Sequence, residues 1–216
     1  MTAQSARTSK EEVLAAYRRT ELLAAARRVF GGSGFEAATM EAIADEAKVA
    51  KGTIYLYFPS KQAIYDATFQ DGMDELQRIS SERIAAAGNN LKQAIHAFVS
   101  ARVSFFQGNP DYYRIYITEK TRHLTGQLPR RNACRSTLES QTKELEDVFA
   151  RAIASGEVRA VDPVAAATAV FDITRGMVGR RLISGATTNE ADDIDFITDL
   201  IWSGLQPRAA GEGPRS

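Results

Sequence analysis

Apolar residues recur every three or four positions along most of the chain, which is the spacing that places them on one face of an α-helix. The pattern is clearest in residues 22–30, 64–79 and 91–106, and no sustained stretch alternates apolar and polar residues as a half-buried strand does. We therefore expect an all-α protein of about nine helices.

Glycine, proline and capping residues divide this pattern into elements. A glycine-rich turn at residues 31–34 closes a first helix that begins near Ser9. Thr39 begins a short second helix, a short third helix spans residues 50–57, and Pro59 ends it. The first three helices are therefore compact.

Longer helices follow this compact part. One runs from Ser60 to about Ala87, and prolines at 110, 129 and 163 stand at the first position of later helices. We expect three parts in the chain: an amino-terminal three-helix domain over 1–60, whose residues 1–9 form a disordered arm; a larger helical domain over 61–206; and a disordered tail over 207–216.

Charge is balanced overall but not locally. The 27 basic and 27 acidic side chains cancel, so a polyanion could be bound only through a local patch. Residues 49–65 contain no acidic residue, yet they carry Lys51 and Lys61 together with Tyr55 and Tyr57. This segment is the best candidate for a surface that faces something negative.

Two short helices joined by a three- or four-residue turn form a helix-turn-helix, in which the second short helix can enter the major groove of DNA. Lys51 and Thr53 can contact base edges, the hydroxyls of Tyr55 and Tyr57 can bind phosphate, and Gly52 allows a close approach of the backbone. The residues expected to contact DNA are Thr39, Lys48, Ala50, Lys51, Gly52, Thr53, Tyr55, Tyr57 and Lys61. Ile43, Ala44, Ala47, Val49 and Ile54 form the inward set that holds the helix pair together.

Residues 20–67 closely resemble the amino-terminal domain of the tetracycline-repressor (TetR) family. Their sequence is TELLAAARRVFGGSGFEAATMEAIADEAKVAKGTIYLYFPSKQAIYDA. The shared pattern includes a glycine turn, Gly-aromatic, a Thr before an Ile-Ala helix, Gly-Thr-Ile-Tyr-x-Tyr-Phe, and a Ser-Lys start to the fourth helix. Two positions depart from it: Lys48 stands where glycine is common, and Ala50 replaces a frequent capping serine.

The resemblance implies a cytoplasmic, ligand-responsive transcriptional regulator, most often a repressor, which acts as a homodimer on a pseudo-palindromic DNA operator. It also implies a small-molecule effector that binds in the larger domain, beyond residue 67, where the resemblance is only architectural. In this reading ligand binding shifts the helix that starts at Ser60 and changes the spacing of the two DNA-binding helices.

Aromatic residues are concentrated between residues 98 and 116. They form either an aromatic core or the wall of a pocket for a small apolar or aromatic ligand. The candidate ligand-binding residues are Phe69, Met73, Phe98, Arg102, Phe105, Phe106, Tyr112, Tyr113 and Tyr116.

The last two helices carry more apolar surface than one side of a helix needs for its own core. This excess indicates either packing within the chain or a dimer interface, and the family resemblance favours four helices, two from each subunit. The candidate interface residues are Ala165, Ala166, Ala169, Gly176, Ile194, Ile197, Ile201, Trp202 and Leu205.

Other function classes find little support. Cys134 is the only cysteine, so no internal disulfide forms, and His96 and His123 are too few for a metal site. No apolar run reaches the roughly 18 residues of a membrane span.

We expect no cofactor and no enzymatic activity. The alternatives are a helical sensor that binds a protein partner and, with weaker support, an oxidoreductase. The oxidoreductase alternative rests on Gly32, Gly34 and Ala37, a loose dinucleotide fingerprint that lacks the preceding strand, and on the Tyr-x-x-x-Lys spacing of Tyr116 and Lys120.

Overall fold

A computed structural model describes residues 3–127, 133–185 and 188–207 of the 216-residue chain. The expected helix start at Pro129 and the expected tail from residue 208 lie outside these ranges. Within them the secondary structure is entirely helical, which confirms the all-α class. The helices are α1 (Ala3–Ala37), α2 (Met40–Glu46), α3 (Lys51–Tyr55), α4 (Lys61–Ala86), α5 (Leu91–Gly108), α6 (Pro110–Leu124), α7 (Ala133–Ser140), α8 (Lys143–Ala154), α9 (Pro163–Ser184) and α10 (Glu190–Leu205).

These ten described helices compare with an expectation of about nine. The additional one arises because a turn at residues 141–142 separates α7 from α8. At the amino terminus α1 already begins at Ala3, within the stretch that we expected to be a disordered arm. No helix in the described ranges is both long and apolar enough to cross a membrane.

The chain divides into two compact units that do not follow chain order. Unit 1 comprises Met1–Met73 and Pro110–Thr137, and unit 2 comprises Asp74–Asn109 and Leu138–Ser216. Helix α4 contributes its first half to unit 1 and its second half to unit 2. Unit 1 therefore contains α6 as well as the three amino-terminal helices.

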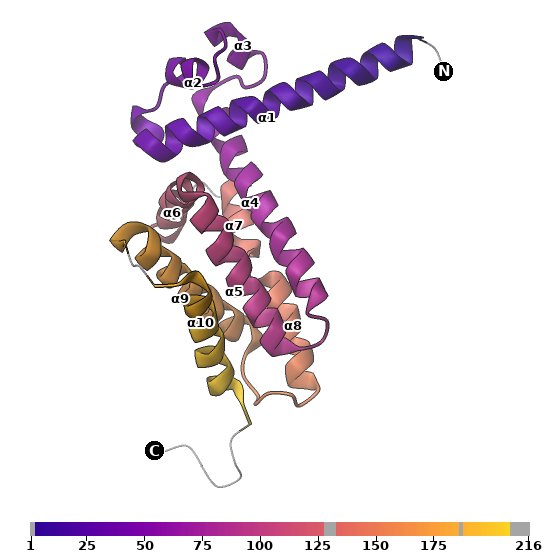
Figure 1. Cartoon of the computed structure of the whole chain (residues 1–216), viewed down its shortest axis with the longest axis vertical. Helices are drawn as coiled ribbons and strands as arrows, with labels where there is room; N and C mark the ends of the chain where they lie inside the picture. The colour runs from indigo at the N-terminus through magenta and orange to yellow at the C-terminus, as the bar shows by residue number, and fades with distance from the viewer. Residues whose placement is uncertain (1–2, 128–132, 186–187, 208–216) are drawn as a thin grey trace. The chain divides into compact units, whose positions relative to one another are not determined.

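In unit 1, α1 packs against both α2 and α6, and α2 packs against α3 (Figure 1). The core of these contacts includes Leu22, Phe30, Ile43 and Ile54, each at most 2% exposed. Ile43, Ile54 and Ala44 are buried as the sequence predicts, whereas Ala47 and Val49 are half-buried. The helix pair α2–α3 is thus held by apolar contacts on its inner side, which leaves its outer side to solvent.

Glycines in α1 have two different roles. Gly34 has a left-handed φ of 77° and a non-helical ψ of 171°, so it kinks α1 as expected for a terminating glycine. Gly31 remains helical and lies against α6: a Cβ at this position would be 2.5 Å from the Cβ of Asp111. The expectation that Gly31 closes the helix is therefore wrong, because its lack of a side chain serves a helix–helix contact.

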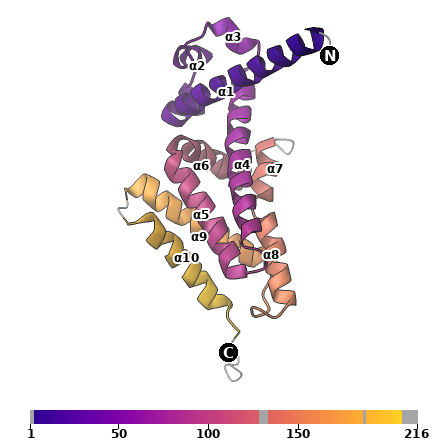
Figure 2. The ribbon, with the colours of Figure 1, turned by 45° about the vertical axis from the view of Figure 1, so that its right-hand side comes forward.

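Unit 2 is built around α5, which packs against α8, α9 and α10 (Figure 2). Helix α5 is buried along most of its length because its apolar residues continue round the helix. Buried residues from the neighbouring helices complete this core, including Phe149 of α8, Val170 of α9 and Ile197 of α10. The result is a helical bundle in which only one side of the α9–α10 pair contributes to the core.

Candidate nucleic-acid interface

The turn between α2 and α3 is short and well bonded. Thr39 caps α2 by accepting a hydrogen bond from the Ala42 amide at 3.0 Å, and the Val49 amide donates to the carbonyl of Ala44 at 3.0 Å. Lys48 adopts a left-handed φ of 55° in this turn. A glycine would adopt that conformation without steric cost, so Lys48 stores backbone strain there.

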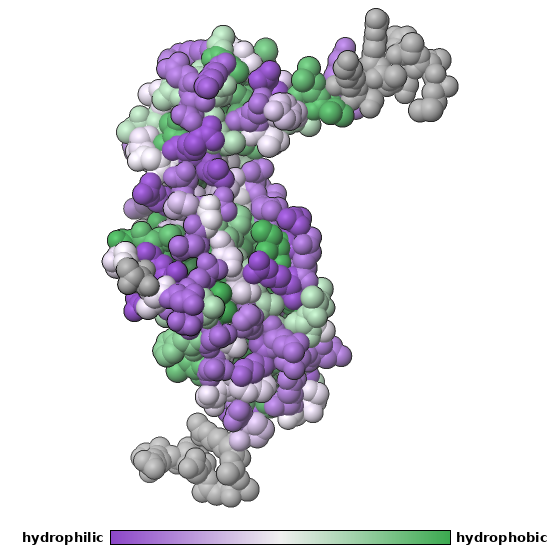
Figure 3. Space-filling model, in the orientation of Figure 1, coloured by the Kyte–Doolittle hydropathy of each residue, from purple (hydrophilic) through white to green (hydrophobic). Residues whose placement is uncertain are grey.

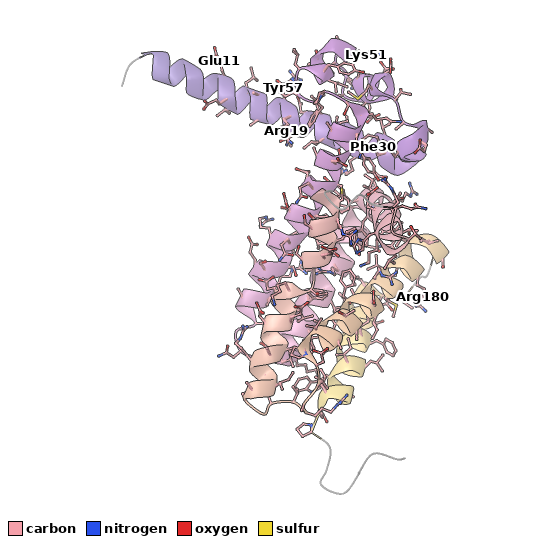
Figure 4. The ribbon with its side chains drawn as sticks, turned by 180° about the vertical axis from the view of Figure 1, so that it is seen from behind. Glu11, Arg19, Phe30, Lys51, Tyr57 and Arg180 are labelled. Atoms are coloured by element: carbon pink, nitrogen blue, oxygen red, sulfur yellow. The ribbon has the colours of Figure 1, made fainter. Side chains whose placement is uncertain are left out.

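Helix α3 lies on the outer part of unit 1. Its one buried residue is Ile54, and its N-cap residue Ala50 provides no side-chain hydrogen bond. Lys51, Gly52 and Tyr55 are exposed, whereas Thr53 and Tyr57 are half-buried. Figure 4 shows Lys51 and Tyr57 on this segment, with Arg19 on the neighbouring α1. The sequence-predicted DNA contacts on α3 are therefore accessible, which a contact with DNA requires.

Lys51 is engaged within unit 1. Its ammonium group forms an ion pair with Glu41 of α2 and lies 6.0 Å from the centroid of the Tyr55 ring. The hydrogen bond with Glu41 raises the pKa of Lys51 and lowers the pKa of Glu41. Both side chains are about half exposed, so the pair is weak and can exchange for a stronger anion.

The Lys61 ammonium group contacts backbone carbonyls, whereas that of Lys51 pairs with a carboxylate. Its ammonium nitrogen lies 2.8 Å from the Phe35 carbonyl oxygen, 3.2 Å from that of Glu36 and 3.1 Å from that of Ala38. The same group lies 4.5 Å from the centroid of the Phe35 ring. Since an ammonium group has three N–H donors, the three carbonyls can use them all. In this structure Lys61 therefore caps the end of α1, and its contact with a DNA phosphate stays a prediction.

Two residues near α3 were missed by the sequence analysis. Leu56, directly after α3, is 83% exposed, and the guanidinium of Arg19 lies 5.2 Å from the centroid of the Phe58 ring. The exposure of Leu56 could have been predicted, because it lies two residues after the inward-facing Ile54 on a helix. Arg19 comes from another helix, and no sequence signal links it to α3.

A buried polar cluster joins α4, α6 and α7 within unit 1. The Tyr65 hydroxyl donates to the Glu119 carboxylate at 3.0 Å, and Arg122 pairs with the same oxygen at 2.8 Å. Cys134 is 1% exposed, and burial together with the nearby Asp66 raises its pKa to about 12. A thiol with so high a pKa stays protonated, so it is a poor nucleophile.

The ligand-binding residues predicted from the sequence are all buried, five in unit 1 and four in unit 2. In unit 1, Tyr112 donates a hydrogen bond to Asp71 at 2.7 Å, lies 5.1 Å from the guanidinium of Arg27 and fits against Gly72, where a Cβ would come within 2.5 Å of its ring. Tyr112 therefore serves packing. The other unit 1 members are Phe69, Met73, Tyr113 and Tyr116.

Arg102 is the centre of the unit 2 group, which also includes Phe98, Phe105 and Phe106. Its guanidinium carbon lies 3.7 Å from the centroid of the Phe98 ring and 5.6 Å from that of Phe171. It donates hydrogen bonds to the Gln141 carbonyl at 3.0 Å and to the Ser80 hydroxyl at 3.4 Å. A charged group that is 4% exposed and framed by aromatic rings is the kind of polar anchor that ligand sites use.

The predicted dimer-interface residues on α9 and α10 separate into two groups. Ile194, Ile197 and Leu205 lie inside unit 2, at most 6% exposed, so they pack within the chain. The accessible members are Ala165, Ala166, Ala169, Gly176, Ile201 and Trp202. Next to them Ile173, Phe196 and Leu200 are 37%, 57% and 53% exposed, and Figure 3 shows hydrophobic areas over these helices.

A groove of about 330 Å³ follows this accessible apolar surface. It is lined by Phe149, Arg159, Val161, Asp162, Ala165, Ala166, Ala169, Ile173, Leu200, Ile201, Gly204 and Leu205. Five of these residues belong to the interface predicted from the sequence. No group of three or more His, Cys, Asp or Glu side chains in the described ranges is arranged to hold a metal ion.

Within the described residues, α2 and α3 are joined by a short turn and α3 is accessible to solvent, which is the arrangement of a helix-turn-helix. Residues 22–68 match the family described as "Bacterial regulatory proteins, tetR family". This match covers the amino-terminal part of the chain, which contains α2 and α3.

Individual relatives agree with this match. The chain is 36% identical over 107 residues to the HTH-type transcriptional activator FasR of Mycolicibacterium smegmatis, covering 47% of this chain and 48% of FasR. It is 34% identical over 143 residues to the HTH-type transcriptional repressor KstR of Mycobacterium tuberculosis, covering 65% of this chain and 60% of KstR. The matched segments thus span less than two thirds of either relative.

Among solved structures, the fold is similar to that of the transcriptional regulator FadR from Bacillus subtilis in complex with stearoyl-CoA. The TM-score is 0.68 at 22% sequence identity, and the match covers 87% of this chain and 99% of FadR. At this identity the likeness establishes the fold.

Proposed function

We propose that the protein is a ligand-responsive transcriptional regulator, a repressor that binds a pseudo-palindromic operator as a homodimer. Residues 1–60 would carry DNA binding, and residues 61–206 would bind the effector and the second subunit. The observation that carries the proposal is the exposure of Lys51, Gly52 and Tyr55 on a helix anchored through Ile54, within a run of residues that contains no acid. Two such helices, about 34–36 Å apart, fit successive major grooves.

Helix α3 supplies the base contacts in this proposal. Lys51 would exchange its weak pair with Glu41 for a guanine edge or a phosphate, and Thr53 would contact a base edge. Lys48 and the hydroxyls of Tyr55 and Tyr57 would contact phosphates, which fixes the position of the helix without sequence preference. Thr39 and Ala50 flank these contacts, and Lys61 supports them by holding the end of α1.

The experiment that tests DNA binding is selection from random duplexes by the full-length protein. The proposal expects enrichment of a two-fold related sequence whose half-sites are about one helical turn apart. Recovery of duplexes that share no sequence would contradict it, and so would salt-independent binding, because phosphate contacts release counterions.

The homodimer would form through the accessible apolar surface of α9 and α10. Phe196 and Leu200 are large and more than half exposed, and the small residues Ala165 and Ala169 allow another helix to approach closely. Burial of such a patch is favourable by roughly 25 cal/mol per Å² of apolar area. The exposed set replaces Ile194, Ile197 and Leu205 in the interface that we propose.

The effector would be a largely apolar molecule whose polar group approaches Arg102. The structural relative FadR was solved with stearoyl-CoA, so long-chain acyl thioesters are the first class to test. A ligand group that accepts hydrogen bonds from the Arg102 guanidinium would compete with the Gln141 carbonyl. Such an exchange would displace the segment between α7 and α8, and α4 could transmit the change because Ser80 also bonds Arg102.

A comparison of stearoyl-CoA, free coenzyme A and stearate shows which part of the ligand the protein recognises. We expect stearoyl-CoA to raise the melting temperature and to release the selected operator, and Arg102→Met to remove both effects while operator binding without ligand persists. Equal responses of the wild type and the Arg102 variant would reject Arg102 as the anchor. A response to free coenzyme A alone would reject an apolar effector.

A further inference from the structure

Leu56 is the most exposed large apolar side chain near the DNA-binding helix. It is 83% exposed, whereas Ile54, two residues earlier, is completely buried. Leaving a leucine in water forgoes the burial energy that such side chains normally contribute. Leu56 has helical backbone angles, with φ −68° and ψ −26°, so it continues the spiral of α3.

The direction of Leu56 follows from helical geometry. Successive residues of an α-helix are rotated by about 100°, so Gly52 and Leu56 each lie about 160° from Ile54, on either side of the outward direction. They are also four residues apart, which places them on the same outer ridge. A Cβ at Gly52 would have no atom within 4 Å, so this ridge consists of bare backbone followed by one apolar side chain.

The groups that surround this ridge are polar and basic. Lys51 and Tyr55 are exposed on one side, and Thr53 and Tyr57 are partly exposed on the other. With Lys48 in the preceding turn, the charged groups between residues 47 and 65 are all lysines. Such a surface complements a polyanion that carries isolated apolar groups, and the thymine C5-methyl in the DNA major groove is such a group.

We infer that Leu56 recognises a thymine methyl group in each operator half-site and thereby determines part of the sequence specificity. The assignment rests on the proposed DNA binding and adds to it an apolar contact beside the polar ones. Gly52 favours this contact because, without a side chain there, the backbone of the ridge can approach the DNA closely enough for the Leu56 methyl groups to reach the base.

Replacement of thymine by deoxyuridine tests this inference directly, because it removes only the C5-methyl. With the operator selected by the full-length protein, each thymine is replaced in turn and the Kd is measured. We expect one symmetry-related pair of thymines at which the wild-type Kd rises about fourfold per half-site, the equivalent of one lost methyl contact. The other thymines should have smaller effects.

Substitutions of Leu56 complete the test. Leu56→Ala should bind the thymine and deoxyuridine operators equally, whereas Leu124→Ala, a control on α6 that is 66% exposed in the wild type, should keep the fourfold difference. Leu56→Gln should shift the preference at that base pair from thymine toward adenine, because glutamine pairs with the N6 and N7 edge. Melting temperatures should be unchanged, since the side chain is largely in water.

The outcomes separate this inference from the proposed function. If the protein selects an operator but no deoxyuridine changes the wild-type Kd, DNA binding stands and the thymine contact is rejected. The same holds if Leu56→Ala keeps the full methyl effect, or if Leu56 substitutions leave DNA binding unaffected and disturb binding to a protein partner. If no duplex is selected, the proposed function itself fails and the thymine contact with it.

Discussion

The ammonium nitrogen of Lys61 lies 2.8 Å from the carbonyl oxygen of Phe35, 26 residues earlier in the chain. This contact joins the start of α4 to the kinked end of α1, and the carbonyls of Glu36 and Ala38 complete it. A lysine that sequence reasoning assigns to a DNA phosphate thus satisfies backbone acceptors that the kink at Gly34 leaves near the helix end.

Removal of the Lys61 charge should therefore reduce stability. We expect Lys61→Met to lower the free energy of unfolding by about 2 kcal/mol, as for hydrogen bonds to a charged group. Urea denaturation measures the change, and Lys51→Met, whose ammonium is exposed, is the matched control. An unchanged free energy of unfolding, with a salt slope of DNA binding lower by about one, would instead support a contact between Lys61 and a DNA phosphate.

Lys48 should be a site at which glycine stabilises the protein. Its φ of 55° is costly for a residue with a Cβ, so Lys48→Gly should raise the free energy of unfolding by about 1 kcal/mol. Lys48→Ala loses the same charge but keeps the strain, and it should not stabilise. Equal stabilities of the two variants in thermal denaturation would argue that the turn is not strained.

Glu41 should restrain the binding of nonspecific DNA. Glu41→Gln removes the charge that pairs with Lys51, so we expect tighter nonspecific binding and a steeper salt dependence, by about one unit of slope. Fluorescence anisotropy at several salt concentrations measures both. Glu46→Gln removes an acid of the same helix that pairs with Arg28; if it acts as strongly as Glu41→Gln, the effect is general charge and not the release of Lys51.

Asp193 should contribute a pH-dependent part of the stability. Burial raises its pKa, but hydrogen bonds from Arg181 at 2.6 Å and Thr188 at 2.8 Å outweigh burial, so the net pKa lies below the ordinary value of 3.8. The folded state therefore favours the charged form. Its stabilisation is complete well above pH 3.8 and is lost as the pH falls through the lower folded pKa.

We expect Asp193→Asn to lower the free energy of unfolding by about 2 kcal/mol at pH 7. The difference from the wild type should shrink below about pH 4, as measured by urea denaturation across pH. Asp195→Asn is the control, because that side chain is 69% exposed. A difference that stays constant down to pH 2 would mean that the carboxylate charge is not the cause.

The α9–α10 surface should hold the dimer together. We expect Phe196→Ser combined with Leu200→Ser to convert the dimer to a monomer in sedimentation measurements, with operator affinity reduced at least tenfold because one half-site contributes less than two. Leu124→Ser changes an exposed leucine of unit 1 and should leave the dimer intact. A double variant that still sediments as a dimer would place the interface elsewhere.

The sequence was sufficient for features that depend on local pattern. Helical periodicity identified the all-α class, and the inward positions Ile43 and Ile54 follow from spacing alone. Thr39 and Pro59 marked helix limits because capping and the missing amide are local effects.

Features that depend on distant partners could not be obtained in this way. Lys61 caps α1 only because the chain returns to it, and Gly31 meets Asp111 from α6, 80 residues later. On α10, apolar residues occur on more than one side, so spacing could not tell whether Ile197 or Leu200 is buried. The choice depends on tertiary packing, which determines the buried side and leaves Phe196 and Leu200 exposed.

Gly31 and Asp111 approach so closely that no methyl group fits between α1 and α6. Because the two helices are in close contact here, we expect a displacement of α6 to move α1, which packs against α2. A contact with more space between the helices would transmit less of such a displacement. The absence of a side chain at Gly31 thus couples the movements of α1 and α6 within unit 1.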